Sequence, residues 1–172
     1  MSIDRLRSVF ERFMEIVVIV LMVALSAEVT LGIVYRTIGQ SLVWYDEIAA
    51  ILLAWLTFYG SALAALKRAH IGFPGLVNGL APTWRVPVIV FSEACVIGFF
   101  ALLGWIGYAI LDVLASDTLV SLPSISVAWT QSVIPIGSLL FIVAELLSLP
   151  RLIASARGRG PVATSDLAEK LH

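Results

Sequence analysis

Three glutamates interrupt long apolar runs of the sequence, and their carboxyl groups are the chemistry that first needs an explanation. Glu28, Glu93 and Glu145 each stand among aliphatic and aromatic residues rather than in a polar segment. An ionisable side chain inside an apolar segment is costly to bury, so each one marks a candidate functional position. The structural alternative is a protonated or hydrogen-bonded glutamate at a contact between helices.

Patterns that carry catalysis are absent from the sequence. We find no Ser/His/Asp arrangement, no glycine-rich phosphate loop and no cluster of metal-ligating side chains. One cysteine, Cys95, and two histidines leave too few ligands for a metal centre. We therefore expect no enzyme activity, and neither a metal nor a cofactor in this chain.

The composition indicates the environment in which these glutamates lie. Of the 172 residues 60% are hydrophobic and only 13% are charged, and the mean hydropathy is +1.00. A water-soluble fold of this size has too little interior to hide so much apolar surface. This excludes a disordered chain, a nucleic-acid binder and an ordinary soluble enzyme, and it predicts an integral membrane protein.

Four apolar stretches predict an all-α fold with four transmembrane helices, over residues 14–35, 48–66, 86–111 and 127–149. Each is long enough to cross a hydrocarbon core of roughly 30 Å, and helices satisfy their own backbone there. Residues 1–155 form the expected membrane domain, with a short interfacial helix over 71–84. Residues 156–172 are expected to form a flexible tail.

The basic residues predict the orientation of these spans. Ten of the eleven lysines and arginines fall on one side of the predicted membrane, and only Arg36 falls on the other. By the positive-inside rule both termini are cytoplasmic, which places the chain in a cytoplasmic or inner membrane. Basic and interfacial residues are then expected to anchor the cytoplasmic face, namely Lys67, Arg68, His70 and Arg85.

The first span also has some features of a secretory signal peptide. Its basic start and the Ala24-Leu25-Ser26 segment fit such a signal with its cleavage site. The apolar stretch, however, continues past Glu28 to Tyr35, and we therefore expect the segment to be retained.

Small and aromatic residues mark candidate contact faces on the spans. Gly60 and Ala64 are four residues apart, a spacing that lets helices approach closely. Glu28 shares a face with Gly32, and Glu93 lies near the face of Gly104. The two glutamates are offset by roughly 10 Å along the membrane normal, so one shared site is not expected. The candidate partner-contact residues are Trp44, Asp46, Glu47, Trp55, Gly60, Ala64, Glu28, Gly32, Glu93 and Gly104.

The run from residue 44 to 71 carries a family resemblance. It begins with Trp44-Tyr45-Asp46-Glu47, continues as an aromatic helix ending in Gly60-Ser61-Ala62, and closes with Lys67-Arg68-Ala69-His70-Ile71. This order resembles the small membrane subunit of TRAP transporters, the DctQ family of tripartite ATP-independent periplasmic systems. One departure follows the run, because Gly72-Phe73-Pro74-Gly75 stands where the family usually has an acidic residue and a leucine-rich short helix.

The resemblance implies a partner-dependent role. In that family the small subunit pairs with a large twelve-span subunit, which carries the substrate and sodium sites, and a soluble periplasmic protein delivers an organic acid. The small subunit would brace the large one and enlarge the outer docking surface, where Trp44, Asp46 and Glu47 would lie. No cofactor is implied for this chain, and no nucleic acid is among the implied partners, which also include membrane lipids.

Two other functions remain open at this point. A small self-dimerising, proton-coupled exporter would use a first-helix glutamate such as Glu28, although such exporters are usually much shorter. A four-helix subunit of a respiratory complex is disfavoured, since no histidine that could bind haem lies inside a span.

Overall fold

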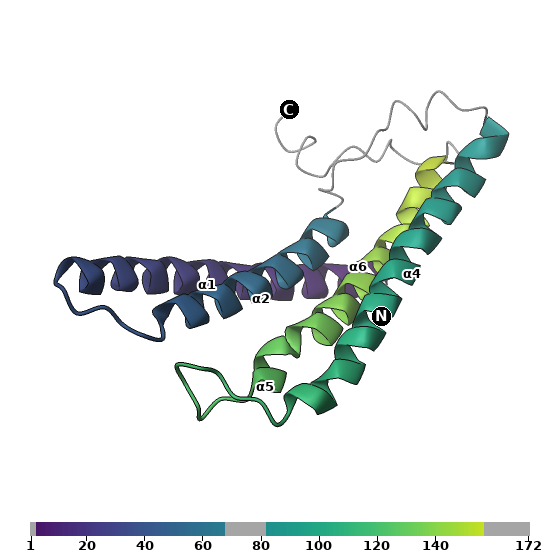
Figure 1. The fold of residues 1–172 in the computed structure, drawn as a ribbon. Coiled ribbons are helices and arrows are strands. Elements are labelled where there is room, and N and C mark those ends of the chain that lie inside the picture. The colour runs from purple at the N-terminus through teal and green to yellow at the C-terminus, as the bar shows by residue number, and fades with distance from the viewer. Residues whose placement is uncertain (1–2, 68–81, 157–172) are drawn as a thin grey trace, which may run out of the picture.

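Five helices make up the part of the chain that the computed structural model describes, residues 3–67 and 82–156 (Figure 1). They are α1 (Ile3–Thr37), α2 (Tyr45–Leu66), α4 (Pro82–Leu114), α5 (Val127–Gln131) and α6 (Val133–Ala156). The described residues contain no strand, and Thr118 and Ser126 form only an isolated antiparallel bridge. The all-α prediction is therefore confirmed.

Four of the described stretches are long and apolar enough to cross a membrane: Arg5–Thr37, Tyr45–Leu66, Thr83–Leu114 and Val127–Ala154. Each contains one of the predicted spans and extends beyond it at one or both ends. α1 has 35 residues, which corresponds to about 52 Å, well beyond the hydrocarbon thickness. Most of the predicted helix over 71–84 and of the predicted tail lies outside the described residues, as do Arg68 and His70.

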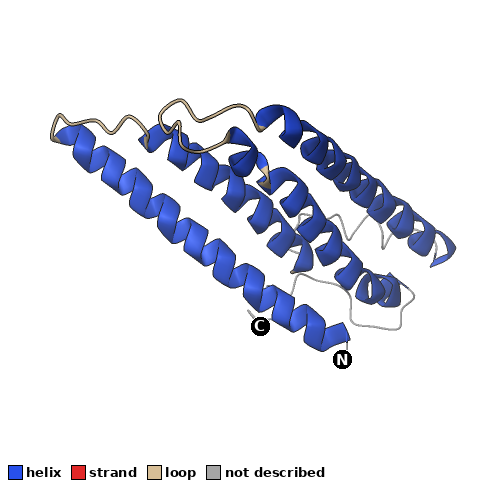
Figure 2. Cartoon of the chain, turned by 90° about the horizontal axis from the view of Figure 1, so that it is seen from below, coloured by secondary structure: helices blue, strands red, loops and turns tan. Residues whose placement is uncertain are grey.

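The long helices lie side by side in one layer, in the order α1, α2, α6, α4 (Figure 2). We call the end of the layer where α1 begins and α6 finishes the terminal end. The opposite end, which carries residues 38–44 and 115–126, is the loop end. α2 and α6 form the centre of the layer, whereas α1 and α4 are its two edges.

The seam between α1 and α2 follows a regular spacing on α1. A series of residues, spaced alternately four and three positions apart, runs from Arg7 through Met14 and Glu28 to Gly32. Each of them is less exposed than most of its neighbours on α1. Such a spacing keeps one stripe of a helix against a partner helix. At the loop end Gly32 lies against Tyr45, because a β-carbon on Gly32 would meet the tyrosine ring at 2.2 Å.

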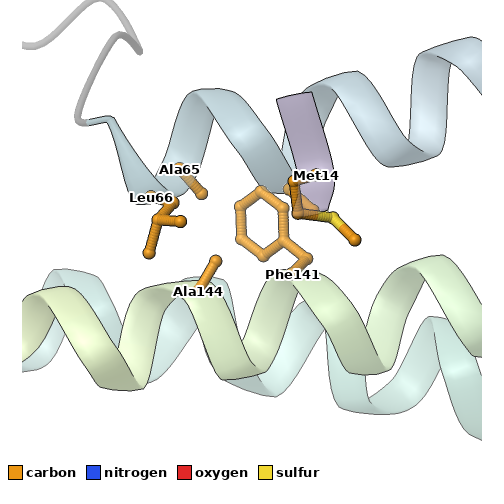
Figure 3. Packing of buried hydrophobic residues seen from close by; sticks show 6 residues of the cluster. Met14, Ala65, Leu66, Phe141 and Ala144 are labelled. Carbon is orange, nitrogen blue, oxygen red and sulfur yellow. The ribbon is translucent and has the colours of Figure 1, made fainter. Parts of the chain in front are cut away.

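The buried core joins the first half of α1, the last turns of α2 and the middle of α6 (Figure 3). Phe141 of α6 stacks on Phe100 of α4, with ring centroids 3.7 Å apart and an interplanar angle of 12°. The alanines of the core let the helix backbones approach closely. This matters because helices in lipid gain no hydrophobic free energy by associating. The core residues are Met14, Ala62, Ala65, Leu66, Phe141 and Ala144.

The helical path breaks between α5 and α6 at Ser132, whose backbone N–H still donates to the Ala128 carbonyl at 3.0 Å. Pro135 follows in the first turn of α6, where a missing N–H is tolerated. Proline nevertheless leaves the carbonyl of Gln131, four residues before it, without its usual helical donor. The break therefore creates a short segment whose carbonyls need donors from elsewhere.

Replacing Gly137 with Ala should destabilise the chain, because the new β-carbon would lie 2.7 Å from Cβ of Phe58 on α2. Overpacking of this kind costs about 1–3 kcal/mol. The measurement is the midpoint of thermal unfolding of the purified chain in detergent micelles. Gly98→Ala is the matched control, since a β-carbon there meets nothing within 4 Å; that variant should be neutral or slightly more stable. Equal midpoints for the two variants would contradict the described contact between α2 and α6.

Candidate partner-binding surfaces

The last turn of α2 is held by side chains from two other helices at the terminal end. Its final carbonyls lack intrahelical donors, and its last turn contains no basic residue. Nη2 of Arg7, on α1, donates to the Leu66 carbonyl at 2.8 Å, and the Ser148 hydroxyl, on α6, donates to the same oxygen at 3.5 Å. One carbonyl thus joins three helices.

A charge cluster surrounds this junction. Lys67 pairs with Glu15 and lies 3.8 Å from Oε1 of Glu11, two carboxylates one turn apart on α1. The predicted anchor Lys67 is therefore also a link between α1 and α2. Glu145, which lies one turn before Ser148, is buried inside the chain with 6% of its surface exposed. Sequence reasoning missed the pairing of Lys67 with Glu11 and Glu15. Two carboxylates one turn apart on α1, together with a lysine at the end of α2, could have indicated it.

Glu47 holds the loop that precedes α5. Its Oε1 accepts the backbone N–H of Val120 at 3.1 Å, and its Oε2 accepts that of Ser121 at 2.9 Å. The Ser121 hydroxyl also donates to Oε2. Both carboxylate oxygens therefore accept hydrogen bonds within the chain, so Glu47 contributes to the loop-end surface by holding the loop in place.

The rest of this loop is ordered by its own backbone. Leu119 N–H donates to the Ile125 carbonyl at 3.0 Å, and Val127 N–H donates to the Asp117 carbonyl at 2.9 Å. Leu119 is buried. Together with the Glu47 contacts, these bonds give residues 117–127 a hairpin-like path.

Trp55, midway along α2, joins this helix to α5. Its indole Nε1 donates to the Thr130 carbonyl at 2.9 Å, near the break between α5 and α6. Its ring lies 5.3 Å from that of Trp129 and 6.2 Å from that of Tyr59. Trp55, which was predicted to contact a partner, therefore packs and hydrogen-bonds mainly within its own chain.

The loop end nevertheless presents apolar surface. Val120 is 93% exposed, and Trp129 is exposed although one side of its ring meets Trp55. An open hollow of about 420 Å³ lies between the loop and α5, lined by Ser124, Ile125, Ser126 and Trp129. Sequence reasoning missed this hollow, although its four lining residues lie within six consecutive positions.

The other predicted contact residues are divided between the interior and the surface. Gly104 is packed within the chain, since a β-carbon there would lie 3.1 Å from Cβ of Ser138 on α6. A β-carbon on Gly60 would meet nothing within 4 Å. Trp44 precedes α2 and is half-buried, Asp46 is exposed in its first turn, and Ala64 is half-buried.

The structure separates the two intramembrane glutamates predicted as candidates. Glu28 lies on α1 and Glu93 on α4, at opposite edges of the layer, and both are half-buried. They do not form one site. Arg85 is half-buried at the beginning of α4, at the terminal end.

Replacing Glu47 with Ala should loosen the loop at residues 117–127, because the amides of Val120 and Ser121 lose their carboxylate acceptor. Hydrogen bonds to charged groups contribute about 1.5–3 kcal/mol, so we expect the hydrogen exchange of these two amides to accelerate at least about tenfold. Mass spectrometry of the deuterated chain in detergent measures this. Asp46→Ala, which removes a neighbouring exposed carboxylate, is the control; an equal effect of both variants would argue that Glu47 does not hold the loop.

Comparison with known proteins identifies the family. The model for the DctQ component of tripartite ATP-independent periplasmic transporters matches residues 25–155. The chain is also similar to the sialic acid TRAP transporter small permease protein SiaQ of Vibrio cholerae serotype O1. The two are 24% identical over 147 residues, which cover 85% of this chain and 84% of the relative.

These matches and the four apolar helices define the setting of the surfaces described above. The protein is a multi-pass component of the bacterial inner membrane and takes part in transport, not in enzyme catalysis. Its family implies a complex with a large membrane subunit and a binding protein. Among the described residues no group of three or more His, Cys, Asp or Glu could hold a metal ion. The chain belongs to the DctQ family, the small permease subunits of TRAP transporters.

Proposed function

We propose that this subunit braces a large transport subunit in the membrane and helps to dock the soluble binding protein that delivers the substrate. The observation that carries the proposal is the open layer. In α4 none of the 18 most apolar consecutive residues is buried inside the chain. In the stretch formed by α5 and α6, only 39% of the corresponding 18 residues are buried. A four-helix layer with two open faces offers a large membrane protein much more contact surface than a closed bundle does.

The loop end suits the second part of this role. Glu47 and Trp55 hold the loop and α5 in place from beneath, while Val120 and Trp129 are exposed above them. Exposed aromatic and apolar groups on a rigid support are typical of protein contact surfaces. The binding protein would therefore touch the loop rather than Glu47 itself.

Docking on this surface requires the loop end to face the periplasm, as the distribution of basic residues predicts. In a Cys95→Ser background, Val120→Cys should react with a membrane-impermeant thiol reagent added to spheroplasts, whereas Trp84→Cys at the start of α4 should not. Both positions are exposed on the chain, so access from one side of the membrane decides the labelling. Disruption of the membrane should make Trp84→Cys reactive, and the reverse pattern would invert the proposed topology.

The transported solute is proposed only at the level of its class, an organic acid. The similar Vibrio protein is named for sialic acid, which belongs to that class. The hollow beside Trp129 is open and shallow, so we expect substrate selection and sodium coupling to reside in the large subunit and the binding protein.

The geometry does not favour a self-dimerising exporter. Such a protein would present Glu28 toward a second copy, whereas Glu28 here lies on the stripe of α1 that faces α2 of its own chain. The family match points the same way, because a small permease subunit of a TRAP transporter works with a separate large subunit and not as a pair of identical chains.

In proteoliposomes the purified chain alone should show no uptake. Uptake of an organic acid should require the large subunit, the binding protein and an inward sodium gradient, because the chain contributes packing and docking only. Measurement of radiolabelled solute under each condition tests this, and proton-driven transport by the chain alone that Glu28→Gln abolishes would overturn the proposal.

The same assay tests docking with a matched pair of exposed tryptophans. Trp129→Ala at the loop end should raise several-fold the concentration of binding protein that gives half-maximal uptake, whereas Trp84→Ala at the terminal end should leave it unchanged. Val120→Ser, which removes an exposed side chain without a packing role, should act like Trp129→Ala. Unchanged half-maximal concentrations in both loop-end variants would rule out docking at this surface.

A further inference from the structure

Glu28 has a carboxyl oxygen that is covered but not hydrogen-bonded. Its Oε1 is buried, and no donor for it is present among the residues 3–67 and 82–156. The side chain as a whole is only half-buried, so one side of the carboxyl group remains open at the edge of the layer. Free rotation about the last side-chain bond lets either oxygen occupy the open side.

The neighbouring part of α2 offers Glu28 no hydrogen-bond donor. Gly32, one turn further along α1, lies against Tyr45, which fixes the register of the two antiparallel helices. The two turns of α2 that follow Tyr45, residues 46–52, begin with the carboxylates Asp46 and Glu47 and continue with apolar side chains, and no donor from them reaches Oε1 of Glu28. α2 therefore supplies shape but no hydrogen bond to the carboxyl group.

The depth of Glu28 makes an outside donor necessary. Glu28 lies seven residues before Tyr35, or about 10 Å into the membrane from that interfacial ring. Lipid chains offer no hydrogen-bond donors, and a carboxyl group without a donor is unfavourable at this depth by several kcal/mol. Intramembrane carboxyl groups accordingly face protein or water-filled cavities and find polar partners there.

We propose that the α1 edge around Glu28 contacts the large permease subunit, and that a polar side chain of that subunit donates a hydrogen bond to Glu28. This inference rests on the proposed bracing function and adds where the large subunit sits and what chemistry it supplies there. α1 suits such a contact because, among the described helices, α2 is its main neighbour and lies on one side of it. Its free surface is a continuous apolar face that includes Ile16, Ile19, Val20, Val23 and Leu31.

The test compares two substitutions of Glu28 in the full-length chain. Glu28→Gln keeps an acceptor of the same shape, whereas Glu28→Leu removes it and fills the seam with an apolar group. Thr30→Val is the matched control, since Thr30 is exposed at similar depth and its hydroxyl already donates to the Ser26 carbonyl at 2.7 Å. Affinity for the large subunit of the same transporter is measured in detergent or nanodiscs, and the unfolding midpoint is measured for each chain alone.

We expect Glu28→Leu to weaken binding of the large subunit about tenfold or more, and Glu28→Gln and Thr30→Val to stay within about threefold of wild type. The lone Glu28→Leu chain should be as stable as wild type or more stable, because the change removes a buried polar group that has no donor there. Misfolding of the variant would weaken the complex and also lower the unfolding midpoint of the lone chain. It would not produce a weaker complex together with a lone chain that is as stable as wild type or more stable.

Two results would overturn the inference while leaving the bracing function intact. Binding of Glu28→Leu at wild-type affinity would assign the α1 edge to lipid, and a destabilised lone Glu28→Leu chain would reveal a donor within the chain. Failure of the wild-type chain itself to bind the large subunit would instead contradict the bracing function.

Discussion

α2 is fixed at both of its ends by polar groups from other segments, and the layer depends on this double attachment. At one end the Leu66 carbonyl accepts from Arg7 and Ser148, and Lys67 pairs with α1. At the other end Glu47 accepts the amides of the loop, and midway along the helix Trp55 donates to α5. Apart from the Trp55 bond, these polar contacts lie near the helix ends, so the membrane-spanning stretch between them is left mainly to close apolar packing.

Close approach rather than bulk hydrophobicity holds the middle of the layer. The absence of a side chain at Gly137 leaves room for the side chain of Phe58. The small alanines of the core leave room for Phe141 between α2 and α6. Lipid is as apolar as these side chains, so only contacts that pack more tightly than lipid does favour association. This explains why a chain with so many apolar residues buries few of them, and why its stability depends on a small number of glycine and alanine positions.

Hydropathy was sufficient to predict the four spans, and the residues from Trp44 to Ile71 were sufficient to indicate the family. The neighbour relations of the helices were beyond sequence reasoning, since a span that is apolar all round has no preferred face. For the same reason Gly60 and Gly104 were equivalent in the sequence, although only Gly104 packs against another helix of the chain. The part played by Glu47 was also missed, because its donors lie 73 and 74 residues away in the sequence.

The order α1, α2, α6, α4 has a consequence for biogenesis. α1 and α2 are consecutive and pair as soon as both have entered the membrane, but α4 has its main neighbour in a helix that is synthesised after it. Among the described helices, α6 supplies most of the packing between α4 and the α1–α2 hairpin, and its Ser148 adds a donor to the Leu66 carbonyl. α6, which is synthesised after the other described helices, is thus the one that joins two earlier insertion products into a single subunit.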